Sequence, residues 1–132
     1  NQPQAIHEIT DEAWDRIIEL NLTSCMSLTR AVVPGMMQRG WGRIIHISSV
    51  LGVGSKERRN VYSATKAGLI GMAKASALDL GPYNITVSCI CPGPFLTVKE
   101  RVGPALMLAS EAGSYITGEA LLVDGGAFAR AL

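Results

Sequence analysis

The stretch GRIIHISS, residues 42–49, is short, rich in isoleucine and apolar on both faces. This pattern is typical of a strand in a parallel sheet that helices cover on both sides. The stretch ITVSCIC, residues 85–91, has the same character, and a shorter apolar run follows at residues 120–123. These stretches therefore predict strands of one buried sheet.

Helical segments alternate with the predicted strands. A first helix is expected over residues 10–38, with Gly40 ending it and Pro34 bending or breaking its last turns. Its N-cap is Thr10, which acidic residues follow directly. Further helices are expected over residues 61–80 and about 102–110. Alternation of this kind argues for βαβ crossovers and a parallel sheet, so the predicted fold class is α/β.

Composition limits the classes of function. The chain has 132 residues, 48% of them hydrophobic, which suits one compact domain. The net charge of +1 makes no electrostatic case for nucleic acid or an anionic membrane as the main partner. The sequence contains neither an apolar run of the roughly 18 residues that a membrane span needs nor a signal-peptide pattern at its first residues. We therefore expect neither a nucleic-acid partner nor a membrane partner.

The cysteine pattern does not predict a metal site. Cys25, Cys89 and Cys91 are an odd number of thiols, and no histidine cluster or second cysteine pair completes a ligand set. We expect no metal, and we interpret the three cysteines as buried free thiols of a protein in the reducing cytoplasm.

Three polar residues suit proton transfer. Tyr62 and Lys66 are four residues apart in an expected helix, so they share one face of it. A free tyrosine, with a pKa of about 10, is a poor acid–base group at neutral pH, but a neighbouring ammonium favours its phenolate form. Ser49 ends the first predicted strand, at the sheet edge where open α/β sheets bind ligands. Together the three could move a proton to or from a carbonyl or alcohol oxygen.

The order of the motifs resembles a known family. The chain carries, in sequence, NLTS (residues 21–24), GRIIHISS, YSATK (62–66), CPGPFLT (91–97) and SYITGEALLVDGG (114–126). This series is similar to the C-terminal half of a classical short-chain dehydrogenase/reductase, closest to 3-oxoacyl carrier-protein reductases and gluconate or glucose dehydrogenases. The resemblance implies one domain over residues 1–132, formed by the second half of a Rossmann-like doubly wound sheet.

The resemblance also implies roles for individual residues. Tyr62 would be the general acid/base, and Lys66 would favour its ionised form and hydrogen-bond the nicotinamide ribose. Ser49 would orient the substrate oxygen, and Asn21 would hold a helix bend and a water that relays protons to Lys66. The residues expected to line the nicotinamide and pyrophosphate side are Pro92, Gly93, Phe95 and Thr97, together with Tyr62 and Lys66.

Cofactor, substrate and assembly follow from the same resemblance. It implies NAD or NADP as cofactor and a small carbonyl or secondary alcohol as substrate. It also implies a homodimer or homotetramer in which the two long helices pack against their symmetry mates. The reaction would be hydride transfer between nicotinamide and that substrate. An inert dehydrogenase-like fragment that serves as an oligomerisation or binding module is the alternative.

Other residues that could suggest function have plainer interpretations. His46 lies between two isoleucines of a strand, and we expect a hydrogen-bonded structural histidine. The stretch GVGSKE, residues 52–57, is expected to be a flexible loop rather than a phosphate cradle, because Glu57 stands in place of the third glycine. The whole predicted loop, residues 52–60, carries three basic residues, Lys56, Arg58 and Arg59. We interpret them as solvated, with attraction of an anionic substrate as the alternative.

The family pattern has two further parts that this chain does not match. A strand, a glycine-rich turn and a helix should precede a segment like NQPQAIHEIT, and they carry the choice between NAD and NADP. In addition, only VKER stands between Thr97 and VGPALMLAS, where the family carries a longer helical excursion. We therefore expect missing segments before Asn1 and near Thr97 and Val98, which would make the chain part of a longer enzyme or a truncated product.

Overall fold

The computed structural model describes residues 3–94 and 98–129 of the chain. Strands β1 (Gly42–Ile47), β2 (Ile85–Pro92) and β3 (Ala120–Val123) form one sheet in the order β1-β2-β3, and both pairings are parallel. The predicted α/β class and all three predicted strands are therefore confirmed.

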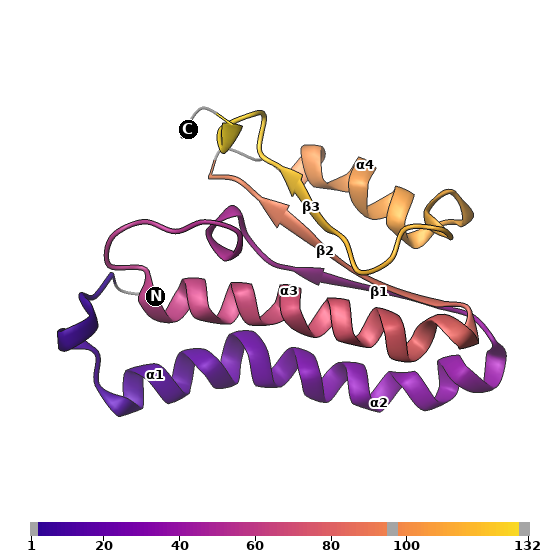
Figure 1. Ribbon diagram of the computed structural model, residues 1–132, viewed down its shortest axis with the longest axis horizontal. Coiled ribbons are helices and arrows are strands. Elements are labelled where there is room, and N and C mark those ends of the chain that lie inside the picture. The colour runs from indigo at the N-terminus through magenta and orange to yellow at the C-terminus, as the bar shows by residue number, and fades with distance from the viewer. Residues whose placement is uncertain (1–2, 95–97, 130–132) are drawn as a thin grey trace.

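Helices cover both faces of this sheet (Figure 1). The helical segments that matter below are α1 (Asp11–Ile18), the π-helix η2 (Glu19–Thr23), α2 (Ser24–Arg39), α3 (Asn60–Leu80) and α4 (Val98–Ala109). The first four lie beneath the sheet in the view of Figure 1, and α4 lies above it. The short 3-10 turns are η1 (Ile6–Glu8), η3 (Val50–Gly52), η4 (Gly81–Tyr83) and η5 (Glu111–Gly113).

Burial explains why the strand sequences are apolar on both faces. The central strand β2 is buried at every position before Pro92. Val87, Cys89 and Cys91 face α3, where they form one cluster with Leu69, Ala73 and Ala77. The intervening Ile90 and the α4 residue Leu108 are also buried, outside that cluster. A strand enclosed in this way has no solvated face on which polar residues could alternate.

The predicted helix ends are largely correct. The Thr10 hydroxyl accepts a hydrogen bond from the Ala13 N–H at 3.2 Å, as an N-cap does. Gly40 ends α2 in the left-handed region, with φ of 63°. Pro34 does not break the helix, because α2 runs through it to Arg39 without interruption, and the alternative of a bend stays a prediction. Helix α4 begins at Val98, earlier than predicted.

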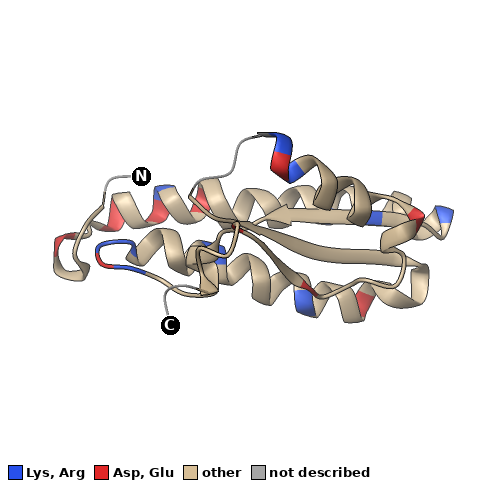
Figure 2. Ribbon diagram, turned by 90° about the horizontal axis from the view of Figure 1, so that it is seen from above, with Lys and Arg blue, Asp and Glu red and all other residues tan. Residues whose placement is uncertain are grey.

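Charge is spread over the surface rather than concentrated. Acidic and basic residues are interspersed at helix ends and loops, and the central sheet is almost free of them (Figure 2). Within residues 3–94 and 98–129, none of the helices has the length and apolar content needed to cross a membrane.

Candidate active site

Tyr62 and Lys66 lie side by side near the start of α3. The Lys66 Nζ atom is 5.6 Å from the centroid of the Tyr62 ring, and both residues are half-buried. The predicted helix places them one turn apart, so their shared face is confirmed. The Lys66 ammonium is therefore close enough to the Tyr62 ring for a cation–π contact.

Lys66 also reaches from α3 to the end of β1. Its Nζ donates a hydrogen bond to the carbonyl of Ile47 at 2.8 Å. Ser49, two residues further along, is extended and only 7% exposed. Its hydroxyl accepts a hydrogen bond from the Leu51 N–H at 3.1 Å, which begins the turn η3. The Lys66 ammonium thus contacts the carboxyl end of β1 two residues before Ser49, and the joint role of the two residues stays a prediction.

Asn21 lies in the π-helix η2, where the helical hydrogen-bond ladder is irregular. The Ser24 N–H donates to the Glu19 carbonyl five residues back, which opens the backbone by one residue. The Asn21 amide donates to the Thr65 hydroxyl at 3.5 Å, and that hydroxyl donates to the Tyr62 carbonyl at 2.7 Å. Asn21 is therefore connected to the turn of α3 that carries Tyr62. The structure thus has a π-helical turn at Asn21, while the predicted helix bend and relay role stay predictions.

Thr65 and Ser48 join these residues, and the sequence interpretation assigned no role to either. Thr65, on α3, is completely buried, and its hydroxyl accepts from Asn21 of η2. Ser48, buried to 3% exposure, donates its hydroxyl hydrogen to the Lys66 carbonyl at 2.7 Å. The available signal was their position, since each is a hydroxyl residue next to a predicted site residue in YSATK or HISS.

The residues predicted to line the cofactor stand at the end of β2. The Ser48 N–H donates to the Ile90 carbonyl at 2.8 Å, which holds the ends of β1 and β2 together. Pro92 and Gly93 therefore lie at the same sheet edge as Ser49. A Cβ at Gly93 would be 2.6 Å from the Cβ of Asp124, so Asp124 supplies a reason for glycine that differs from the expected ligand. Phe95 and Thr97 lie outside the described residues.

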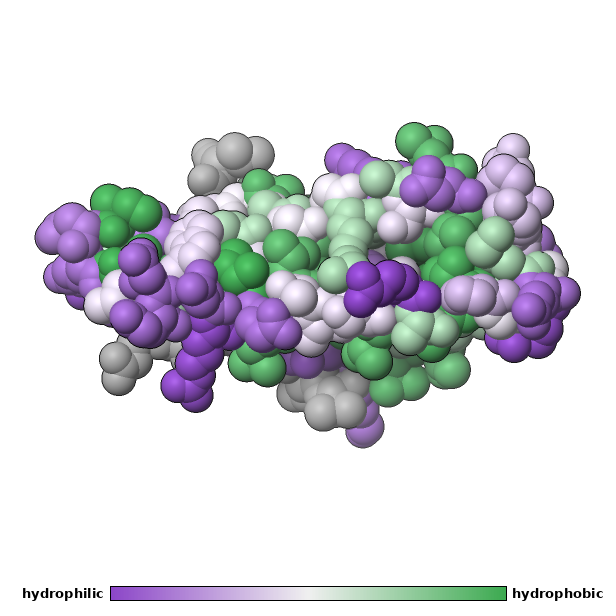
Figure 3. Space-filling model, turned by 90° about the horizontal axis from the view of Figure 1, so that it is seen from below, coloured by the Kyte–Doolittle hydropathy of each residue, from purple (hydrophilic) through white to green (hydrophobic). Residues whose placement is uncertain are grey.

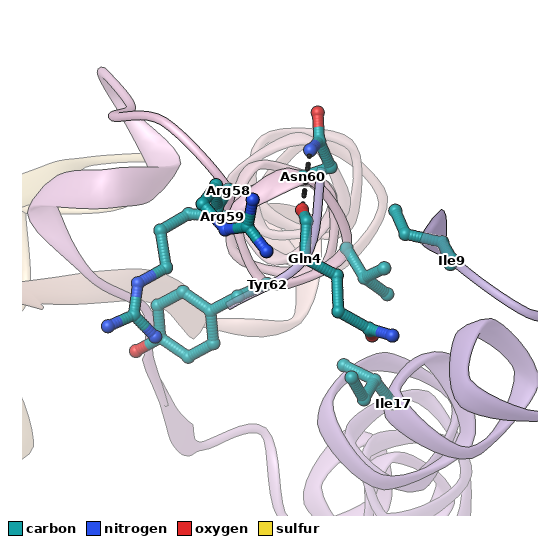
Figure 4. Close-up of a pocket in the computed structure, with 8 residues that line it drawn as sticks. Gln4, Ile9, Ile17, Arg58, Arg59, Asn60 and Tyr62 are labelled. Atoms are coloured by element: carbon teal, nitrogen blue, oxygen red, sulfur yellow. Dashed lines mark hydrogen bonds between the residues drawn. The ribbon is translucent and has the colours of Figure 1, made fainter. Parts of the chain in front are cut away.

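A small pocket, open to solvent, lies against the start of α3 (Figure 4). It is lined by Gln4, Ile9, Ile17, Arg58, Arg59, Asn60, Val61 and Tyr62. Gln4 closes one side, where its carbonyl accepts from the Asn60 amide at 3.1 Å. Arg58 forms an ion pair with Glu8 at 2.7 Å, with both side chains substantially exposed. That pairing agrees with the solvated interpretation of Arg58.

His46 is a structural residue, but the expectation that it is hydrogen-bonded is wrong for Nε2. The residue is 6% exposed, and its Nε2 is buried with no partner within the described part of the chain. His46 pairs in register with Cys89, on the face where Ile44 packs against the apolar core cluster. Burial lowers the pKa of His46 from its ordinary value, so the neutral imidazole is favoured.

The three cysteines are free thiols. Cys89 donates to the Leu69 carbonyl at 3.5 Å, and burial raises its pKa to about 12. Burial also raises the pKa of Cys91. Both thiols therefore stay protonated at neutral pH and are poor nucleophiles and metal ligands. No group of three potential metal-binding side chains occurs among residues 3–94 and 98–129.

Fold and site together define a class: α/β proteins with a parallel sheet, polar side chains at its carboxyl edge and a Tyr-x-x-x-Lys pair on the following helix. The family model described as short chain dehydrogenase matches residues 1–103. The chain belongs to the short-chain dehydrogenase family, which confirms the predicted resemblance.

Several relatives support this assignment. A probable galactose dehydrogenase of Rhizobium meliloti is 33% identical over 152 residues, which cover 95% of this chain and 59% of that protein. D-beta-hydroxybutyrate dehydrogenase of Cupriavidus necator is 42% identical over 100 residues, covering 74% of this chain and 39% of that one. The chain thus spans less than two thirds of the length of these relatives. The expected closer likeness to 3-oxoacyl reductases stays a prediction.

A solved structure has the same fold. The crystal structure of acetoin dehydrogenase from Enterobacter cloacae superposes with a TM-score of 0.92 at 24% identity, covering 99% of this chain and 61% of that one. The partial Rossmann-like architecture is therefore confirmed.

Proposed function

We propose that this chain carries the acid–base half of an NAD(P)-dependent oxidoreductase, which transfers hydride between nicotinamide and a carbonyl or secondary alcohol. The observation that supports the proposal is the position of Lys66, whose Nζ is 5.6 Å from the Tyr62 ring centroid and donates to the Ile47 carbonyl, two residues before Ser49 at the sheet edge. Open α/β sheets bind ligands at that edge.

The residues divide the proton chemistry among them. The Tyr62 hydroxyl gives a proton to the substrate oxygen during reduction and takes it back during oxidation. The Ser49 hydroxyl, at the start of the turn η3, orients that oxygen, and the Lys66 ammonium stabilises the phenolate that Tyr62 becomes. The nicotinamide, when bound, supplies or accepts the hydride.

The cofactor fits the residues that are present. An ammonium has three donors, and Lys66 uses one on the Ile47 carbonyl, which leaves donors for a ribose hydroxyl and a relay water. Asn21, linked to α3 through Thr65, would hold that water. Pro92 and Gly93 would face the nicotinamide, with Phe95 and Thr97 following them. NAD and NADP both remain candidates, as does any small carbonyl or alcohol substrate.

We further propose a homodimer or homotetramer built on the helical face. Leu20 and Leu28 are each 68% exposed and Val32 is 45% exposed, at helical spacing along η2 and α2. Figure 3 views the molecule from below, the side on which α1 and α2 lie in Figure 1, and shows hydrophobic residues gathered between hydrophilic ends. A second copy is the simplest cover for such a stripe in this family. Free thiols suit a reducing compartment such as the cytoplasm.

This same helical face supports the second candidate function, an inert oligomerisation or binding module. The two candidates differ in cofactor binding, since only an enzyme needs NADH or NADPH to bind. Titration of the intact protein with each reduced cofactor, followed by fluorescence, distinguishes them.

The central test of catalysis is Tyr62→Phe, which removes one oxygen atom. We expect kcat to fall by roughly 10²–10⁴-fold, because the proton donor is lost while the ring remains. NAD and NADP reduction would be followed with galactose, 3-hydroxybutyrate and acetoin, which the names of the relatives suggest.

The matched control is Tyr115→Phe, the same change at a fully exposed tyrosine, where we expect no effect on kcat. Unchanged turnover in Tyr62→Phe would contradict the acid–base assignment. A wild-type protein that binds neither reduced cofactor would favour the binding module.

A further inference from the structure

Ser48 occupies a closed junction between β1, η3, α3 and β2. Its side chain is 3% exposed, and its hydroxyl donates to the Lys66 carbonyl on α3 at 2.7 Å. The Ser48 backbone N–H donates to the Ile90 carbonyl of β2 at 2.8 Å. One buried serine therefore bonds to both elements that flank the end of β1.

Gly52 shows how tightly this junction is packed. A Cβ at Gly52 would lie 2.7 Å from the Lys66 carbonyl carbon, 2.8 Å from the carbonyl oxygen and 2.8 Å from the Ser48 hydroxyl. Two of those atoms are backbone, which cannot move aside cheaply. The turn η3 thus lies directly against the turn of α3 that contains Lys66, with the Ser48 hydroxyl between them.

Lys66 is therefore bound to β1 at both of its ends. Its carbonyl accepts from the Ser48 side chain, and its Nζ donates to the Ile47 carbonyl at 2.8 Å. Ile47, Ser48 and Ser49 are consecutive, so these two bonds connect α3 to the two residues that directly precede Ser49. Loss of the Ser48 bond would leave the lysine backbone free to shift relative to Ser49.

We propose that Ser48 is a positioning residue, which holds the Tyr62–Lys66 turn of α3 in register with Ser49 through its hydrogen bond to the Lys66 carbonyl. This inference rests on the proposed function of those three residues. Catalytic groups misplaced by about 1 Å can lose about 10²-fold in rate, so a single buried bond at this point affects turnover without touching substrate.

The test is Ser48→Ala in the full-length active protein. We expect kcat to fall about 10-fold or more while the KM values for cofactor and substrate change by less than about 3-fold, because binding groups remain and only their alignment is lost. Hydrogen exchange of the α3 amides near Lys66 should become faster, since the carbonyl at this turn loses a partner.

Ser88→Ala is the matched control. Ser88 is 2% exposed on the neighbouring strand, and its hydroxyl has no partner among the residues that the structure describes. We expect this variant to keep wild-type kcat and wild-type exchange. Gly52→Ala is a second variant that removes no hydroxyl but displaces η3 from Lys66, and it should lower kcat in the same way as Ser48→Ala.

The outcomes separate this inference from the proposed function. The positioning role is overturned if Ser48→Ala keeps kcat within about 2-fold of wild type, or if Ser48→Ala and Ser88→Ala lose kcat equally. If the wild type has no turnover, the proposed function is contradicted independently of Ser48. Hydrogen exchange of the α3 amides then tests the positioning role alone. Unchanged exchange near Lys66 in Ser48→Ala would then overturn the positioning role, and faster exchange would support it.

Discussion

The two adjacent serines after β1 are similarly buried but differ in their hydrogen-bond partners. Both are nearly inaccessible, at 3% and 7% exposure for Ser48 and Ser49. The Ser48 hydroxyl donates across to α3, whereas the Ser49 hydroxyl accepts from the Leu51 N–H in its own turn. The hydrogen of the Ser48 hydroxyl is thus used within the fold, whereas that of Ser49 has no acceptor among the residues that the structure describes.

His46 predicts a pH dependence of stability. Burial lowers its pKa from 6.5, so the unfolded chain binds the proton more readily than the folded one. Its contribution to the free energy of unfolding is complete above pH 6.5 and is lost progressively as the pH falls below that value. The loss is at most about 1.4 kcal/mol per pH unit for one group.

His46→Phe should therefore flatten the decline in stability between about pH 7 and pH 5, as measured by urea unfolding at each pH. The control is His7→Gln, at the other histidine of the chain, which should keep the wild-type decline. Equal slopes in His46→Phe and wild type would exclude the buried imidazole as the cause.

At the scale of elements, the connection after β2 depends on a close approach to the residue after β3. The Gly93 N–H donates to the Val123 carbonyl at 3.2 Å, and Asp124 is close enough to exclude a Cβ at Gly93. The Asp124 carboxylate also accepts from the backbone N–H groups of Gly126 and Phe128. Because Asp124 is held in this way, it cannot readily move aside.

We expect Gly93→Ala to destabilise the fold by about 1–3 kcal/mol, the usual range for overpacking. The atoms that would have to move include the Asp124 Cα, which is 3.0 Å from the position of the added Cβ. Urea unfolding would measure the change. Gly103→Ala is the control, since nothing lies within 4 Å of its Cβ position in α4, and it should be neutral or stabilising. A free energy of unfolding equal to that of the wild type in Gly93→Ala would contradict this prediction, because it would show that Asp124 moves aside without loss of stability.

The π-helix η2 is an element that sequence periodicity could not resolve. The apolar spacing predicts one helix over residues 10–38, but the structure has α1, η2 and α2 in series. One extra residue in a turn hardly changes the spacing of apolar side chains, so the pattern is nearly the same for both. Only the polar Asn21 within the helix indicated where the ladder would open.

At the scale of the whole molecule, the helical face predicts self-association. We expect light scattering to show that the wild type is at least a dimer. The variant Leu28→Glu, at an exposed position of α2, should have a smaller mass, because it places a charge in the apolar stripe. Leu106→Glu is the control on α4, across the sheet, where the leucine is 64% exposed. A wild-type monomer, or an unchanged mass for Leu28→Glu, would contradict the helical interface.

The sequence by itself determined the α/β class, the three strands and the pairing of Tyr62 with Lys66. Each depends on local periodicity or on a helical spacing of four residues, which the chain carries within a short window. Tertiary structure decided the rest: the bond from Ser48 to Lys66 spans 18 residues, and that from Asn21 to Thr65 spans 44. Such contacts depend on how distant elements pack, and no local pattern encodes the partner of a buried hydroxyl or the missing partner of His46.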